Sequence, residues 1–120
     1  MRAISDNVSM LNLKVGRLGE LSNAIKINSL CQRDSISTYV GAKYESSIGR
    51  WHNIALASLA SFKYPSNIAA SERYFLEDIV DNPIISKDGC VYPSNEIGGG
   101  ARIDYEKLSY YTTESIQCKI

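Results

Sequence analysis

The stretch ISDNVSMLNLKVGRLGELSNAIKINSL, residues 4–30, decides the predicted fold. Its apolar residues recur in alternating steps of four and three, which is the spacing of an amphipathic helix with a heptad seam. The seam consists of Ile4, Val8, Leu11, Val15, Leu18 and Ile25, with Ser22 in the remaining position. Gly16 and Gly19 oppose a continuous helix, because each costs about 1 kcal/mol relative to alanine in a helix interior. We therefore expect a core-facing helix over residues 5–30, or two shorter helices that break at these glycines.

Two further helices are expected after this segment. A second apolar stripe at helical spacing predicts a helix within residues 34–62, with Trp51 and Leu59 in the core. The stripe consists of Tyr44, Ile48, Trp51, Ala55, Leu59 and Phe62. Pro65 ends this helix, because the residue before a proline is pushed out of the helical region. A third helix is predicted over residues 67–81.

Beyond Pro83 the sequence changes character. Asp88-Gly89 stands between two short β-prone runs, which indicates a hairpin. Gly98, Gly99 and Gly100 mark a loop. In the tail, Asp104 is suited to cap a short helix, whereas the alternation after Leu108 favours a strand. We predict a strand there.

These elements predict an α+β fold: an antiparallel helical bundle of about three helices, followed by a small antiparallel β element. A mainly α fold is the alternative. The 120 residues are expected to form a single domain, 1–120, because most domains are of this size. Within it, residues 1–81 are mostly helical, and residues 82–120 hold the hairpin, the glycine loop and a C-terminal strand or short helix.

Cysteine usage and hydropathy predict a cytoplasmic protein that does not bind a membrane. The three cysteines are odd in number and show no CxxC spacing, unlike the cysteines of a secreted disulfide scaffold. The first residues lack the apolar centre of a signal peptide. The longest apolar stretch, residues 54–62, is far shorter than the roughly 20 residues that span a bilayer.

The sequence offers no catalytic or metal-binding constellation. His52 is the single histidine, and no nucleophile motif accompanies it. The acidic residues Glu77, Asp78 and Asp81 are interpreted as a solvated helix face. We therefore predict that the protein is not an enzyme and that it has no catalytic residue, no metal and no cofactor.

The remaining features predict binding. Three glycines beside Arg102 form the most distinctive loop, since their backbone amides and a planar guanidinium suit an anionic contact. Tyrosines are frequent at contact surfaces, and the chain has eight. Up to Lys63 the chain carries eight basic and four acidic residues, so its first half is basic. The candidate partner-binding residues are Gly98, Gly99, Gly100, Arg102, Tyr105, Tyr110, Tyr111, Lys14 and Arg17.

From these features we predict a noncatalytic protein-interaction module that binds another protein and itself as a homodimer. A phage or mobile-element accessory protein that inhibits a host macromolecular complex is one version of this function. A nucleic-acid-binding module that uses the basic N-terminal half is the first alternative. A binder of a small anionic ligand that uses the loop at 98–102 is the second.

Overall fold

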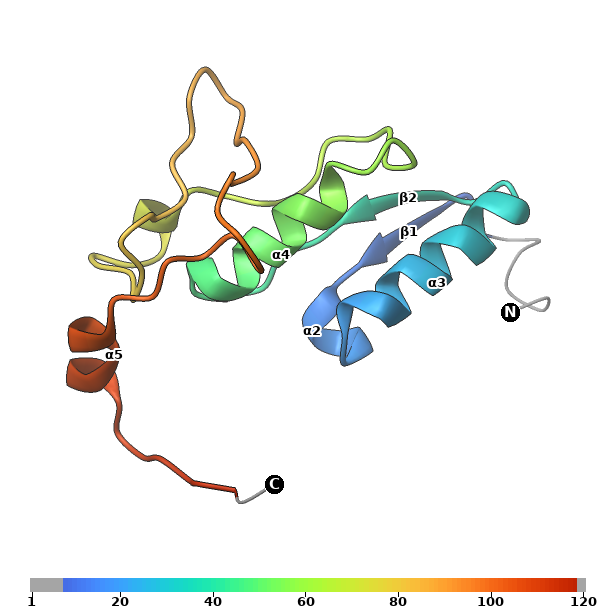
Figure 1. Ribbon diagram of the computed structural model, residues 1–120. Coiled ribbons are helices and arrows are strands. Elements are labelled where there is room, and N and C mark those ends of the chain that lie inside the picture. The colour runs from blue at the N-terminus through green and yellow to red at the C-terminus, as the bar shows by residue number, and fades with distance from the viewer. Residues whose placement is uncertain (1–7, 119–120) are drawn as a thin grey trace.

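The computed structural model describes residues 8–118 and has a parallel pair of strands at its centre (Figure 1). The elements are β1 (Met10–Leu13), α2 (Val15–Leu18), α3 (Leu21–Arg33), β2 (Ser37–Val40), α4 (Ser47–Ala57), a 3₁₀ turn (Ser71–Arg73) and α5 (Tyr105–Tyr111). Parallel strands need a crossover connection between them, and α2 and α3 supply it. The first half of the chain is therefore a β-α-β unit.

One face of this sheet is covered by two helices. Leu13 pairs with Val40 across the strands, and both side chains are buried. Ala24 of α3 and Leu56 of α4 pack with Val40 in one apolar cluster. The helices α3 and α4 therefore lie on the same side of the sheet, where the alternate side chains of the strands point.

The other face of the sheet is polar and has little cover. Asn12 and Lys14 alternate with the half-buried Leu11 and the buried Leu13, so they point to this second face. A Cβ on Gly41, which follows β2, would overlap the side chain of Asn12. The buried Oδ1 of Asn12 has no hydrogen-bond partner among the described residues.

Buried polar groups fix the start of α4. The Asp78 carboxylate accepts hydrogen bonds from the Ser47 amide (3.0 Å to Oδ2) and the Ser47 hydroxyl (2.6 Å). The Ser47 and Ser71 hydroxyls lie 2.6 Å apart, and the Ile84 amide donates to both. Burial works to raise the pKa of Asp78, but the hydrogen bonds from Ser47 and the Ile79 amide outweigh it and lower that pKa.

The predicted helical bundle is wrong, and so is the antiparallel β element. Residues 10–13 of the first predicted helix form β1. Of the two glycines, Gly19 marks a break, with φ +86° between α2 and α3, whereas Gly16 lies within α2. The heptad spacing fits this segment by coincidence, because the pairing that makes Met10–Leu13 a strand comes from residues 37–40. Ile4 and residues 5–7 lie outside the described residues.

The second predicted helix contains β2 and α4, and its apolar stripe does not face the core. Leu59 is 42% exposed and Trp51 is half-buried. The buried positions of α4 are Ser47, Arg50, Asn53, Ile54 and Leu56. An apolar stripe cannot reveal this face, because three of its five residues are polar and are accommodated by tertiary contacts.

The segments after α4 contain less regular structure than predicted. Residues 67–81 contain only the 3₁₀ turn. The Asp88-Gly89 turn forms, with positive φ at both residues and an antiparallel bridge from Lys87 to Cys90, but no strands extend from it. The tail forms α5 in place of the predicted strand, and Asp104 caps it through the Glu106 and Lys107 amides.

The chain is more open than a compact domain of its length. Its radius of gyration is 16.1 Å, against about 13–14 Å expected for a compact domain of this size. In Figure 1, α5 and the segment after it extend away from the β-α-β unit. Leu76 and Ile97 are fully exposed. No helix within residues 8–118 is long and apolar enough to cross a bilayer.

The contact between Gly41 and Asn12 predicts a coupled pair of substitutions. Gly41→Ala should lower the free energy of unfolding by about 1–3 kcal/mol, because its methyl group would overlap Asn12. Adding Asn12→Ala should recover most of that loss. Chemical denaturation of the two single variants and the double variant measures the coupling, and simple additivity would refute the contact.

The buried Asp78 carboxylate predicts a pH-dependent stability. Asp78→Asn should cost about 1–3 kcal/mol at neutral pH, because an amide cannot accept all the hydrogen bonds of the carboxylate. The pKa of Asp78 is lowered in the folded state, so its contribution is present above the unfolded pKa and is lost as the pH falls through the folded pKa. The difference in unfolding free energy between wild type and variant should therefore shrink below about pH 4. A difference that stays constant on acidification would contradict this assignment.

Candidate functional site

The carboxyl ends of β1 and β2 meet at one edge of the sheet and open into a pocket. Parallel strands run in the same direction, so the residues that follow them are brought together, and this edge is where ligands bind in parallel α/β folds. The pocket has a volume of about 340 Å³. Its lining residues are Lys14, Arg17, Ala42, Lys43, Tyr44, Asn67 and Tyr74.

Lys14 is the first residue after β1 and is held across the sheet. Its Nζ donates a hydrogen bond of 2.7 Å to the Ala42 carbonyl, which lies just beyond β2. Its side chain is half-buried. Lys14 therefore presents a positioned amine to the pocket, and a positioned amine is one of the groups that can transfer a proton to or from a bound molecule.

The pocket is strongly cationic. Lys14, Arg17 and Lys43 all line it. The ion pairs found among residues 8–118 join Arg33 to Asp34, Arg102 to Glu96, and Lys107 to Asp104. None of them involves the three pocket cations, so the site is suited to an anionic ligand.

Two aromatic rings form a wall of the pocket, and a buried arginine supports them. The rings of Tyr44 and Tyr74 meet edge to face with centroids 5.2 Å apart. Arg50 is completely buried, with Cζ 5.2 Å from the Tyr74 centroid and 5.3 Å from that of Phe75. It donates to the carbonyls of Glu45 (2.7 Å) and Ala69 (2.9 Å). Arg50 thus links the backbone next to Tyr44, at Glu45, to the segment that leads to Tyr74, at Ala69.

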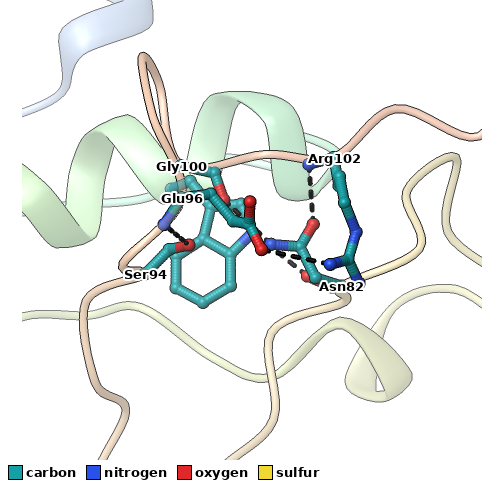
Figure 2. Close-up of polar contacts among 6 residues, drawn as sticks. Asn82, Ser94, Glu96, Gly100 and Arg102 are labelled. Carbon is teal, nitrogen blue, oxygen red and sulfur yellow. Dashed lines mark hydrogen bonds and ion pairs between the residues drawn. The ribbon is translucent and has the colours of Figure 1, made fainter.

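The glycine loop lies against α4, away from the pocket, and its polar groups bond within the chain. Asn82 donates to the Gly100 carbonyl (2.9 Å) and accepts from the Arg102 amide (2.7 Å), as Figure 2 shows. The Arg102 guanidinium pairs with Glu96 at 3.1 Å (Figure 2). A Cβ on Gly99 would lie 2.6 Å from Cε1 of His52. The glycines therefore permit a close approach to α4, and Gly98 and Gly100 have positive φ.

The three candidate tyrosines lie on or at the ends of α5. Tyr105 and Tyr110 are 74% and 81% exposed. Tyr110 and Tyr111 meet edge to face at 4.9 Å. The Tyr111 hydroxyl donates to Glu77 (3.2 Å), and this hydrogen bond raises the pKa of Tyr111. Of the nine candidate partner-binding residues, the structure brings only Lys14 and Arg17 into the pocket; the glycine loop and these tyrosines lie elsewhere.

Several expectations about side chains change in the structure. Asp78 is buried and bonded, so the interpretation of the acidic residues as a solvated face is wrong for it. His52 Nδ1 lies 2.9 Å from the Ile48 carbonyl within α4. Sequence reasoning missed Lys43, Tyr44 and Tyr74 as pocket residues. The β-prone run Ser37–Val40 was the signal that would have placed Lys43 just after a strand.

Comparison with a protein family model finds one match. The family described as Domain of unknown function (DUF8230) C-terminal domain matches residues 1–74. That range includes β1, β2, α4 and all of the pocket lining.

Several curated bacterial enzymes are similar to this chain. The o-succinylbenzoate synthase of Listeria innocua is 41% identical over 109 residues, which is 88% of this chain and 29% of that enzyme. The o-succinylbenzoate synthase of Enterococcus faecalis is 35% identical over 102 residues, or 85% and 28%. The N-succinylamino acid racemase of Thermus thermophilus is 31% identical over 94 residues, or 78% and 26%. The chain thus spans less than a third of the length of these relatives.

Two similar solved structures are members of the enolase superfamily. An enolase-superfamily member from Listeria innocua superposes with a TM-score of 0.84 at 37% identity, covering 88% of this chain and 29% of that one. A member of the same superfamily from Enterococcus faecalis has a TM-score of 0.82 at 35% identity, with coverage of 86% and 28%.

These similarities correct the functional prediction. The relatives are named enzymes, so the prediction of a noncatalytic interaction module, its phage-like inhibitor version and the conclusion that the protein is not an enzyme are wrong. The two alternatives, a nucleic-acid-binding module and a binder of a small anionic ligand at the loop 98–102, are wrong for the same reason. The physical reason is that the pocket is assembled from residues that follow β1, residues that follow β2 and two residues of the segment 67–74, which no local motif in the sequence connects.

Proposed function

The chain belongs to the family described as Domain of unknown function (DUF8230) C-terminal domain, and from this premise we propose that it forms part of the active site of an enolase-superfamily enzyme. The proposed enzyme acts on a carboxylate that bears a succinyl group, as the names of the relatives indicate for those proteins. The observation that carries the proposal is Lys14, at the carboxyl end of β1, with its Nζ held in a cationic pocket.

The reaction class is proton transfer at a carbon next to a carboxylate. Enolase-superfamily sites use a lysine or histidine as the base. In the proposed step Lys14 Nζ takes the proton from this carbon, and the C–H electron pair moves into the adjacent carboxylate. A racemase then returns a proton to the carbon, so only the proton removal is proposed as common to both named activities.

Magnesium ions stabilise the enediolate in this superfamily, but the residues of this chain do not fit a magnesium site. No group of three or more His, Cys, Asp or Glu residues comes together within residues 8–118. The pocket lining contains three cations and no carboxylate, and that charge repels a divalent cation. We therefore assign no step to a metal held by this segment.

The open face of the sheet supports the view that further chain completes the site. All-parallel sheets occur almost only where both faces are covered. Here the apolar cluster lies on the face toward α3 and α4, and side chains of the other face such as Asn12 and Tyr39 are only half-buried. Met10, at the start of β1, is 41% exposed. The polar face that carries Asn12 and Lys14 would then line the interior of a larger sheet. A cytoplasmic location and self-association remain part of this proposal. The continuous helix that would present the heptad seam does not form, because Met10–Leu13 is a strand.

A chimera tests the proposal. The 109-residue matching segment of the Listeria innocua o-succinylbenzoate synthase is replaced by the corresponding part of this chain. The chimera should form o-succinylbenzoate, and Lys14→Ala should lower kcat by about 10²–10⁴-fold, the usual contribution of a general acid or base.

The matched control is Lys26→Ala, since Lys26 is an exposed lysine on α3. It should leave kcat unchanged. Product formation followed by absorbance, with circular dichroism to verify folding, gives the measurement. A folded chimera without activity, or a Lys14→Ala chimera within tenfold of its parent, would rule out the proposed role.

A further inference from the structure

Lys43 lines the same pocket as Lys14, and its side chain has no hydrogen-bond or ion-pair partner among the described residues. Its backbone amide donates to Glu45 Oε2 at 2.6 Å, which fixes the backbone after β2. Within residues 8–118, the Lys43 ammonium has no carboxylate within 4.0 Å and no hydrogen bond. The charge is therefore available to a ligand.

The stem of Lys43 runs from the segment after β2 to the α2 turn. A Cβ built on Gly16 would lie 3.8 Å from Cδ of Lys43, so the aliphatic chain passes over the α2 turn. This turn also carries Arg17, which lines the same pocket. Two cations are thus held close to the turn that follows β1, whereas the Lys14 amine is bonded to the Ala42 carbonyl at the end of β2.

The same pocket has two aromatic lining residues. Tyr44 and Tyr74 line the pocket with their rings in edge-to-face contact. A ligand with an apolar middle and a carboxylate at each end matches this arrangement, because apolar carbons can pack on the rings while each carboxylate meets a cation.

We propose that Lys43 is a specificity-determining residue that binds the second carboxylate of a dicarboxylate substrate, while Lys14 acts beside the first. This inference rests on the proposed function, since it assigns the two ends of the substrate around Lys14. Arg17 assists by adding positive charge on the same side. The lysine ammonium forms a charge-assisted hydrogen bond with the carboxylate, and the contact selects against analogues that lack it.

The experiment compares two ligands on the chimera described above, with this chain either unsubstituted or carrying one change, by isothermal titration calorimetry. The first ligand is o-succinylbenzoate, which has two carboxylates, and the second is 2-butanoylbenzoate, in which the side-chain carboxylate is replaced by a methyl group. The unsubstituted chain should bind the dicarboxylate about three- to tenfold more tightly, the scale of a partly exposed ion pair. The preference should decrease as salt is raised.

Lys43→Met tests the residue, because methionine keeps a flexible apolar stem and removes the charge. It should reduce the ratio of the two dissociation constants to near one and leave the affinity for 2-butanoylbenzoate unchanged. Lys26→Met is the matched control and should keep the ratio of the unsubstituted chain. Equal affinities in the unsubstituted chain, no binding of o-succinylbenzoate, or an unchanged ratio in Lys43→Met would overturn the proposal.

These results separate the two proposals. An unchanged binding ratio in Lys43→Met together with a large loss of turnover in the Lys14→Ala chimera refutes the second-carboxylate site alone. If the ratio of the two dissociation constants falls to near one in Lys43→Met while the Lys14→Ala chimera keeps normal turnover, only the proposed role of Lys14 is refuted.

Discussion

The parallel pairing of β1 with β2 is the constraint on which the rest of the structure depends. Because the strands run in the same direction, the chain must cross over between them, and α3 makes that crossing along one face of the sheet. The same pairing brings Lys14, directly after one strand, to the loop that follows the other. Fold and candidate site thus have a common origin: an antiparallel pair would have placed these residues at opposite ends.

Buried polar interactions then hold the loops that complete the pocket. Asp78 binds the first turn of α4 through Ser47, and Arg50 on the same helix binds the carbonyls of Glu45 and Ala69. Buried polar groups favour the geometry in which they are hydrogen-bonded, so these bonds fix the loops, although Arg50 Nη2 is buried without a partner among the described residues. Helix α4 therefore contacts both the aromatic wall, through Arg50, and the glycine loop, through His52.

The positive charge of the pocket indicates which functions this segment would serve in the proposed enzyme and which functions other segments would serve. Three cations at the carboxyl edge suit binding of carboxylates and proton transfer, and they do not suit a metal. The large radius of gyration and the exposed Met10 of β1 agree with an enzyme in which other segments pack against this one. In this view the segment supplies recognition of the anion, and other segments supply the remaining ligands.

The sequence predicted those features that depend on neighbours in the chain. The Asp88-Gly89 turn, the break at Gly19 and the suitability of Asp104 as a helix cap all follow from interactions within a few residues, and the structure contains each of them. The composition likewise singled out Lys14 and Arg17 as contact residues. The strand at Met10–Leu13 did not follow in the same way, because its apolar spacing fits a helix equally well.

Contacts between distant segments decided the remainder. Met10–Leu13 is a strand because Ser37–Val40 pairs with it, and α4 buries Arg50 because Glu45, Ala69 and two aromatic rings surround that side chain. Lys14 and Lys43 line the same pocket only because the crossover brings the ends of β1 and β2 together. Hydropathy along one sequence reports local periodicity and carries no information on such pairings. The sequence alone therefore determined turns, breaks and caps, and the tertiary structure decided which face is buried and which charges share a site.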